Sequence, residues 1–290
     1  MQRILFWLIY PLLWGISKLP FPIFYKVSDV ICFLVYRALG YRKKTVRYNL
    51  NLAFPQMDKE EKKKIEQRFY SHMCDMFLEM IKSISISEEQ MRKRFVFKNI
   101  DLLQEFENNG ESMLIMTGHY ASYEWSSSMQ FYTDNTTYGI YKKIKNDRFD
   151  ALVQRSRARW NSKLLQNKIA PKVMARNKTE GVIATYLFIA DQSPKASKNN
   201  HFCLFFDHEV PFFTGAERIA KNLDMPILFM NVQKKSRGFY EATFELINEK
   251  PSIVPNYQIT DLFAEKLEAQ IKNAPEFYLW THKKFKHIKS

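Results

Sequence analysis

The 290-residue sequence is poor in glycine, cysteine and acidic residues, and each shortage excludes a class of protein. Only 8 glycines occur, against 24 Phe and 15 Tyr, and this balance indicates a compact protein rather than a flexible one. The three cysteines, Cys32, Cys74 and Cys203, are widely spaced and form neither a CxxC metal motif nor a disulfide pattern. We therefore expect the body of the protein to lie in a reducing compartment.

The shortage of acidic residues makes the protein strongly basic. It contains 30 Asp and Glu residues and 44 Lys and Arg residues, which gives a net charge of +14 and a pI near 9.5. A basic surface favours anionic partners: nucleic acid, acidic lipid, a phosphorylated substrate or an acidic carrier protein. No recognisable RNA- or DNA-binding module surrounds the basic, aromatic C-terminal tail, so we expect no nucleic-acid partner.

Several catalytic and cofactor motifs are also missing. The chain has no G-x-S-x-G nucleophile elbow, no P-loop and no dinucleotide-binding glycine motif, so we expect no bound cofactor. His201, Cys203, Asp207 and His208 lie close in sequence, but their spacing matches no familiar metal site. An aromatic-rich β-hairpin over these residues is the better interpretation, and we expect no metal.

The N-terminal apolar run, Ile4–Ile16, is shorter than the roughly 20 residues that a spanning helix needs. It contains two Trp and one Tyr, and a second apolar run, Val30–Tyr36, follows it. Five basic residues between Arg37 and Arg47 come next, a pattern typical of a cytoplasmic segment attracted to anionic lipid. We expect residues 1–40 to form an interfacial or bitopic membrane anchor and residues 41–290 the catalytic domain. The alternative is a core helix of a soluble protein.

Beyond the anchor, short apolar runs alternate with helical patterns. This alternation predicts an α/β fold with a central, mostly parallel or mixed sheet flanked by helices. The expected strands are Ser112–Met116, Thr136–Tyr141, Val182–Ala190, Pro226–Val232 and Phe239–Leu246, with a hairpin over His201–Phe213. The expected helices are Lys59–Lys82, Ala121–Phe131, Asp147–Lys163, Thr214–Asn222 and Asp261–Lys272.

One stretch combines a buried strand with a histidine and a carboxylate. Thr117-Gly118 ends the first expected strand, His119 follows on the turn, and Glu124 lies five residues later. Two residues five apart in one helix cannot meet, but a carboxylate in the first turns of the helix can fold back onto a histidine that precedes it. A carboxylate behind an imidazole fixes its tautomer for general base catalysis. The alternative is a turn-capping histidine and a glutamate that favours the helix dipole.

The motif His119-x-x-x-x-Glu124 resembles the HX4(D/E) motif of the bacterial lipid A late acyltransferases, a branch of the glycerolipid acyltransferase superfamily. Further blocks resemble that family in the same order along nearly the whole chain. They are Asn49–Pro55, Tyr141-Lys142 with Lys145-Asn146, Arg157-Ala158-Arg159, Asp191-Gln192, Phe205-Phe206 with Phe213–Ala216, and Pro275–Lys286. Six ordered blocks rarely arise by chance.

The resemblance implies a glycerol-3-phosphate-acyltransferase-like fold and an enzyme on the cytoplasmic face of the bacterial inner membrane. The enzyme would transfer an acyl chain from acyl carrier protein to a hydroxyl of a lipid A precursor. By position in the family's blocks, His119 would be the general base and Glu124 its orienting partner. Substrate binding or support of the site falls to the other matching residues: Lys142, Arg157, Arg159, Asp191 and Gln192.

Lys142 stands where the family usually has Arg, and the change removes a bidentate phosphate contact. The preferred acceptor is therefore open. An aminolipid or a lysophospholipid is an alternative acceptor, and a non-catalytic protein that binds anionic lipid is the alternative outside enzymes.

Overall fold

The protein, a computed structural model that describes residues 2–289, is built on one seven-stranded sheet. Residues 1 and 290, the outer ends of the predicted anchor and catalytic domain, lie outside the described residues. The strand order is β1-β9-β8-β2-β5-β3-β4, and every neighbouring pair is parallel except β8 and β9. The strands are β1 (Phe95–Phe97), β2 (Met113–Thr117), β3 (Thr136–Tyr141), β4 (Lys163–Gln166), β5 (Ala184–Ile189), β8 (Ile227–Ser236) and β9 (Phe239–Asn248). The predicted α/β class and mostly parallel sheet are confirmed.

Strand β2 is the centre of the sheet and of the core. It pairs with β5 on one side and β8 on the other, and all five of its residues are buried. A strand covered on both faces needs a continuous apolar run rather than an alternating one, and Met113–Met116 supplies it. The two-stranded hairpin β6 (His201–Phe205) and β7 (His208–Phe212) forms a separate antiparallel sheet, as predicted.

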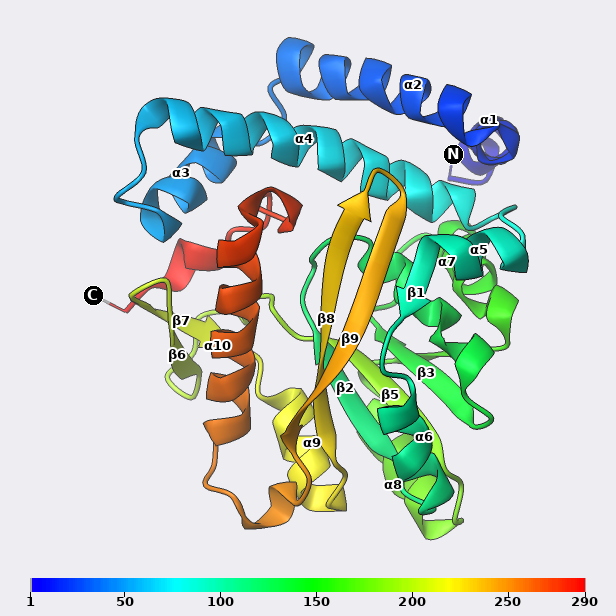
Figure 1. The fold of residues 1–290 in the computed structure, drawn as a ribbon, viewed down its shortest axis with the longest axis vertical. Coiled ribbons are helices and arrows are strands. Elements are labelled where there is room, and N and C mark those ends of the chain that lie inside the picture. The colour runs from blue at the N-terminus through cyan, green and yellow to red at the C-terminus, as the bar shows by residue number, and fades with distance from the viewer. Residues whose placement is uncertain (1, 290) are drawn as a thin grey trace.

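Helices surround the sheet (Figure 1). The α-helices are α1 (Gln2–Lys18), α2 (Phe21–Cys32), α3 (Lys43–Ala53), α4 (Lys59–Lys82), α5 (Glu88–Arg94), α6 (Asp101–Asn108), α7 (Asp147–Arg157), α8 (Ala170–Thr179), α9 (Gly215–Leu223) and α10 (Gln258–Asn273). A π-helix, η1 (Phe33–Ala38), follows α2, and the 3-10 helices are η2 (Tyr123–Tyr132), η3 (Ala158–Trp160), η4 (Pro251–Ile253), η5 (Pro275–Phe277) and η6 (Lys284–His287).

The longest helix, α4, begins and ends where the sequence predicts. Asp58 accepts a hydrogen bond from the Glu61 backbone while the Glu61 side chain accepts one from Asp58, a capping box that fixes the start of the helix. Figure 1 shows α4 crossing beside the arrowhead of β8, at the carboxyl end of the sheet. Open α/β sheets bind their ligands at this end.

The N-terminal helices pack on α4 and leave an apolar face exposed. Lys82 of α4 donates hydrogen bonds to the carbonyls of Ser17 and Leu19 at the end of α1. The exposed apolar side chains of α1, α2 and η1 are Trp7, Leu8, Leu12, Trp14, Ile23, Val30, Phe33 and Leu34. No helix within residues 2–289 combines the length and the apolar character needed to cross a membrane. The anchor over residues 1–40 stays a prediction.

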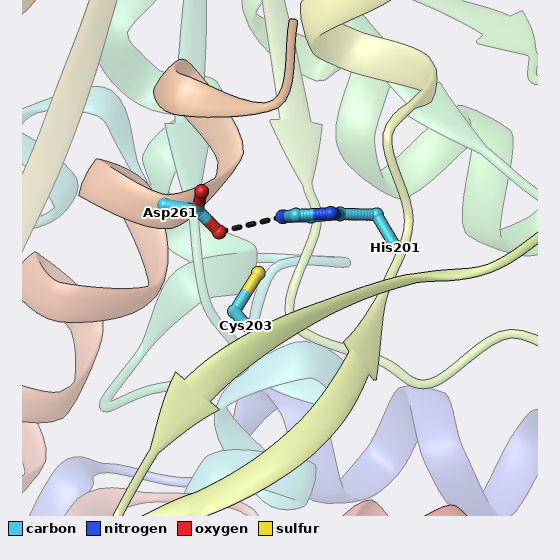
Figure 2. Close-up of side chains that lie close together, drawn as sticks. All are labelled: His201, Cys203 and Asp261. Carbon is cyan, nitrogen blue, oxygen red and sulfur yellow. Dashed lines mark hydrogen bonds and ion pairs between the residues drawn. The ribbon is translucent and has the colours of Figure 1, made fainter. Parts of the chain in front are cut away.

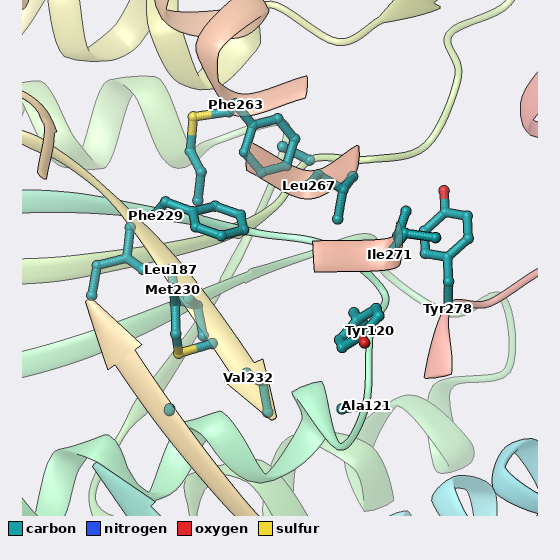
Figure 3. Packing of buried hydrophobic residues seen from close by; sticks show 14 of the residues in the cluster. Tyr120, Ala121, Leu187, Phe229, Met230, Val232, Phe263, Leu267, Ile271 and Tyr278 are labelled. Atoms are coloured by element: carbon teal, nitrogen blue, oxygen red, sulfur yellow. The ribbon is translucent and has the colours of Figure 1, made fainter. Parts of the chain in front are cut away.

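Helix α10 packs against the centre of the sheet, beside the turn that follows β2. Figure 3 shows Phe263, Leu267 and Ile271 of α10 facing the sheet and the turn residue Tyr120. A Cβ atom on Gly118 would lie 2.6 Å from Leu267 Cδ1, and the Leu267 side chain is fully buried. Glycine at this position lets the chain turn directly beneath α10.

One predicted helix is too long. The expected helix Asp147–Lys163 ends as α7 at Arg157, and Lys163 begins β4. Asn161 adopts a left-handed backbone conformation (φ 66°), which stops the chain from continuing as a helix. The four residues of β4 add the edge strand beside β3.

Candidate active site

Two side chains that lie far apart in sequence meet at the ends of neighbouring strands. Thr117, the last residue of β2, pairs with Ile189, the last residue of β5. The Ala190 backbone N–H then donates to the Thr117 carbonyl. His119 and Asp191 follow at equivalent positions, each two residues past the end of its strand. Parallel pairing therefore brings the two side chains together at the carboxyl edge of the sheet.

The imidazole of His119 hydrogen-bonds the carboxylate of Asp191, with 2.6 Å between Nδ1 and Oδ1. A carboxylate only accepts hydrogen bonds, so Nδ1 carries the proton and Nε2 keeps its lone pair. The Gln192 side-chain nitrogen lies 3.3 Å from that Nε2. The His119 side chain is 16% exposed, while that of Asp191 is buried. A neutral imidazole held in this tautomer can accept a proton at Nε2.

The structure corrects the predicted partner of His119. Glu124 lies in η2, after the turn, but its carboxylate pairs with Arg157 of α7 through two hydrogen bonds. One joins Arg157 Nε to Glu124 Oε2 at 2.6 Å. His119 donates its Nδ1 hydrogen bond to the Asp191 carboxylate instead. The spacing of His119 and Glu124 reflects only local chain geometry, whereas the register of β2 and β5 brings Asp191 into hydrogen-bonding distance.

Burial and charge act against each other on His119. Burial favours the neutral ring, but the negative charge and hydrogen bond of Asp191, together with the charge of Glu124, outweigh it. These carboxylates raise the pKa of His119 above its ordinary value of 6.5, and Arg157 opposes the rise. Glu124 therefore affects the proton affinity of His119 through its charge.

Asp191 stays ionised despite complete burial. Burial alone would raise its pKa, but His119 and then Lys284 hold the pKa of Asp191 at about 2. The buried Lys284 amine shows the opposite balance, because burial lowers its pKa to about 7 although Asp191 favours its charged form. The ionised carboxylate of Asp191 therefore provides a negative charge beside Nδ1 of the His119 imidazole.

The C-terminal segment, residues 275–284, holds the turn that carries His119. The Leu279 backbone N–H donates to the His119 carbonyl at 3.1 Å, and the Ala121 N–H donates to the Phe277 carbonyl at 2.9 Å. Ala121 adopts a left-handed backbone conformation (φ 50°), an uncommon state for a residue with a side chain. These two hydrogen bonds fix a turn whose backbone is locally unfavourable.

The same C-terminal segment holds the turn that carries Asp191. The Ser193 backbone N–H donates to Nε2 of His282 at 3.2 Å, and the Ser193 hydroxyl donates to the Lys284 carbonyl at 2.9 Å. Burial lowers the pKa of His282 to about 4, so its ring is a neutral acceptor at ordinary pH. Asn49 in α3 donates to the carbonyls of Trp280 and His282 and so anchors the segment.

His282 and Asn49 were not among the predicted site residues. Their signal was present, since both belong to the ordered blocks Asn49–Pro55 and Pro275–Lys286. Spacing in the sequence does not indicate which distant turn such a block contacts.

A second buried carboxylate fixes the start of η2. Glu79 in α4 accepts hydrogen bonds from the hydroxyls of Ser122, Tyr25 and Tyr240. The Glu79 backbone carbonyl accepts one from the Trp125 indole. Burial raises the pKa of Glu79 to about 7. Through Ser122 and Trp125, Glu79 fixes the residues on either side of Glu124; it was not among the predicted site residues.

The ion pair of Glu124 and Arg157 forms part of the wall of an apolar cavity of about 270 Å³. Its walls come from α1, α4 and α7, and most of its lining side chains are apolar: Leu13, Phe77, Met80, Ile81, Ile84, Phe149, Leu152 and Val153. An apolar cavity with an ion pair in its wall suits a hydrocarbon chain that carries a polar head.

The remaining predicted substrate-binding residues lie apart from His119. Arg159, just after α7, donates to the Ser83 carbonyl at 2.7 Å and stacks on the Trp160 ring. Lys142 directly follows β3 and its side chain is exposed. In the part of the chain that the structure describes, Lys142 shares no hydrogen bond or ion pair with the other predicted site residues.

His201, Cys203 and Asp261 form a separate cluster between the hairpin and α10 (Figure 2). His201 Nε2 lies 2.6 Å from Asp261 Oδ1, and the buried Cys203 thiol has its pKa raised by burial and then by Asp261. Two ligands of one tetrahedral Zn²⁺, each about 2.0–2.2 Å from the ion, would stand about 3.3 Å or more apart. The 2.6 Å separation is that of a hydrogen bond, and the cluster fits side chains that satisfy one another.

Comparison with known proteins adds independent information. The family model described as bacterial lipid A biosynthesis acyltransferase matches residues 1–287. The chain is 24% identical over 284 residues to a lipid A biosynthesis lauroyltransferase of Escherichia coli (strain K12). The matched region covers 97% of this chain and 90% of that protein. It is 22% identical over 276 residues to a lipid A biosynthesis palmitoleoyltransferase of the same organism, covering 94% and 88%. A lipid A biosynthesis acyltransferase 2 of Shigella flexneri is 20% identical over 294 residues, covering 98% and 90%.

Proposed function

The chain belongs to the bacterial lipid A biosynthesis acyltransferase family and is an acyltransferase. From this we propose that it transfers an acyl chain from acyl carrier protein to a hydroxyl of a lipid A precursor. We place this reaction on the cytoplasmic face of the inner membrane. The net charge of +14 suits both an acidic carrier protein and an anionic lipid surface. The exposed apolar face of α1, α2 and η1 supports contact with a membrane interface.

His119 is the general base of the proposed reaction. Its Nε2 takes the proton of the acceptor hydroxyl, and the oxygen attacks the thioester carbonyl of the donor. The C–O ester bond forms, the C–S bond breaks, and the imidazolium returns the proton to the departing thiolate. Asp191 stabilises the imidazolium formed in between. The observation that carries this proposal is the hydrogen bond from Nδ1 to Asp191, which leaves Nε2 as the proton acceptor.

The other predicted residues act around that base. Glu124 adds a second negative charge near the imidazole and orients the Arg157 guanidinium through two hydrogen bonds. Arg157, which lines the apolar cavity, orients the reacting groups. The Gln192 side-chain nitrogen, 3.3 Å from His119 Nε2, donates to the acceptor oxygen as that oxygen loses its proton to Nε2. The cavity itself holds the hydrocarbon chain of a substrate.

A transfer assay with purified components tests the reaction. The protein is incubated with acyl-loaded carrier protein and, in parallel, with a lipid A precursor, an aminolipid and a lysophospholipid, and products are identified by mass spectrometry. We expect acyl transfer to the lipid A precursor. Transfer to one of the other lipids alone would replace the proposed acceptor.

His119→Ala distinguishes an enzyme of this mechanism from a non-catalytic lipid-binding protein. General bases contribute about 10²–10⁴-fold, so turnover should fall by that factor while the melting temperature stays within a few degrees of the wild type. Unchanged turnover in this variant would refute the assignment of His119.

A further inference from the structure

A second cavity, of about 400 Å³, lies between α1 and α7 and is basic rather than apolar. Three arginines line it: Arg148 and Arg155 from α7, and Arg159 just beyond the end of that helix. Aromatic side chains of α1 form the opposite wall: Phe6, Trp7 and Tyr10. No carboxylate is among the lining residues in the described part of the chain.

The helical spacing explains why the arginines converge. Residues 148 and 155 are seven apart, close to two turns of an α-helix, and therefore lie on the same face of α7. Arg157 lies on another face and points to Glu124, as its position in the helix predicts. Arg155 was not among the predicted site residues. The cavity gives that residue a defined position.

The three guanidinium groups retain most of their donors for a ligand. Within the described residues none of them forms an ion pair, and Arg159 donates one hydrogen bond, to the Ser83 carbonyl. Arg148 lies against the rings of Phe6 and Trp7, with 5.8 and 5.5 Å to the ring centres. Such cation–π contacts hold the guanidinium in place but leave its N–H groups available.

This basic cavity adjoins the apolar one. Ile84, Leu152 and Ser156 line both, so a basic cavity lies next to an apolar cavity whose wall contains Glu124 and Arg157. Trp7, one of the exposed apolar residues of α1, is also in the wall of the basic cavity. A ligand that fills both compartments has an anionic head and an apolar tail.

We propose that the cavity between α1 and α7 binds a phosphate group on a lipid head group. The guanidinium group of arginine can form two hydrogen bonds to one phosphate, and no carboxylate among the described lining residues competes for the three arginines. The phosphate has two sources with the same chemistry, a phosphorylated acyl acceptor and a phospholipid of the membrane. The first source rests on the function proposed above, whereas the second does not.

Binding is measured first without catalysis. Isothermal titration with short-chain phosphatidic acid, and with the diacylglycerol of the same chains, isolates the phosphate. The wild type should bind the phosphatidic acid at least about tenfold more tightly, because each charged hydrogen bond contributes substantially. Arg148→Gln/Arg155→Gln should abolish that preference. The control variant Lys168→Gln/Lys172→Gln removes the same amount of charge from exposed positions near and in α8. It should keep the preference for phosphatidic acid.

Kinetics then identifies the source of the phosphate. If it belongs to the acceptor, removing the acceptor's phosphates should raise KM about 10- to 100-fold in the wild type with little change in kcat, and Arg148→Gln/Arg155→Gln should show no such increase. If it belongs to the membrane, that variant should instead lose sedimentation with phosphatidylglycerol vesicles and keep its KM in detergent. Both results support the site.

The site is refuted if the wild type, the arginine variant and the lysine variant bind phosphatidic acid equally. Absence of acyl transfer with every acceptor would refute the proposed function while the titration still reports on the site. If the double variant melts at a lower temperature than the wild type, the titration is repeated with Arg155→Gln alone, because Arg155 is exposed.

Discussion

His119 and Asp191 stand two residues beyond the paired ends of adjacent parallel strands, and 2.6 Å separates Nδ1 of one from Oδ1 of the other. The geometry of this pair is set by the backbone register of β2 and β5 rather than by a flexible loop. A shift of one residue in that register would displace one of the two side chains relative to the other and separate the pair. The pairing of β2 with β5 therefore sets the spacing of the candidate active site.

The pH dependence of activity follows from this pair. Only the neutral imidazole accepts a proton, and Asp191 and Glu124 raise the pKa of His119. We expect kcat/KM to increase with pH and to reach half its maximum above pH 6.5. In Asp191→Asn, burial dominates, so the midpoint should move to lower pH while the rate falls about 10²–10⁴-fold. A pH–rate profile of both proteins checks this; a midpoint that does not move would exclude Asp191 as the partner.

The pair of Glu124 and Arg157 should affect stability as well as catalysis. The Glu124 side chain is 7% exposed and that of Arg157 22%, so Glu124→Ala leaves a largely buried guanidinium without its partner. We expect a loss of about 3 kcal/mol of unfolding free energy by chemical denaturation. Glu124→Leu/Arg157→Met should recover most of that stability but remain inactive. Activity in the double variant would show that the pair is only structural.

His282 should act on the rate through the position of Asp191. His282→Ala removes the acceptor of the Ser193 N–H, and the freed turn should lower kcat about 10- to 100-fold with KM nearly unchanged. His282→Gln keeps an acceptor oxygen and should restore most of the rate. Equal kcat values for the Ala and Gln variants would contradict a role in positioning.

Glu79 should make the protein less stable as pH rises. Its pKa is raised to about 7 from 4.5, so the folded state holds the proton more tightly than the unfolded state. Stability from this group is complete below pH 4.5 and is lost as pH rises through 7. Between pH 5.5 and 8 we expect a loss of about 2 kcal/mol that Glu79→Gln does not show. Denaturation curves at both pH values measure it, with the exposed Glu60→Gln as control.

Gly118 should tolerate a side chain only if Leu267 is shortened. The 2.6 Å approach predicts that Gly118→Ala costs about 1–3 kcal/mol, because Leu267 has no free space to move into. In a Leu267→Ala background the same change should cost little. A double-mutant cycle of unfolding free energies gives the coupling; additive losses would show that the contact relaxes in solution.

The sequence predicts the elements of this fold well where the signal is local. Strand β2, helix α4 with its Asp58 cap and the hairpin over His201–Phe213 all follow from apolar runs, caps and alternation. The end of α7 does not, because a left-handed Asn161 overrides a continuous helical pattern. The π-helix η1 gives no local signal either.

For the candidate active site too, only the features that depend on adjacent residues can be predicted from the sequence. His119 and its place on the strand-to-helix turn can be predicted, since both depend on a few adjacent residues. Its carboxylate partner cannot, since Asp191 is selected by strand pairing across 72 positions. Likewise the basic cavity needs the packing of α1 on α7, which no single segment encodes.

The hydrogen bond from Leu279 to the His119 carbonyl has a consequence for how the enzyme folds. It joins positions 119 and 279 and so closes a very large loop, which makes it a contact of high contact order. Closing so large a loop costs chain entropy, so we expect this contact to form after the strands between its two ends have found their register. The catalytic turn therefore reaches its working geometry among the last events of folding, and a partly folded intermediate with an intact central sheet should have no activity.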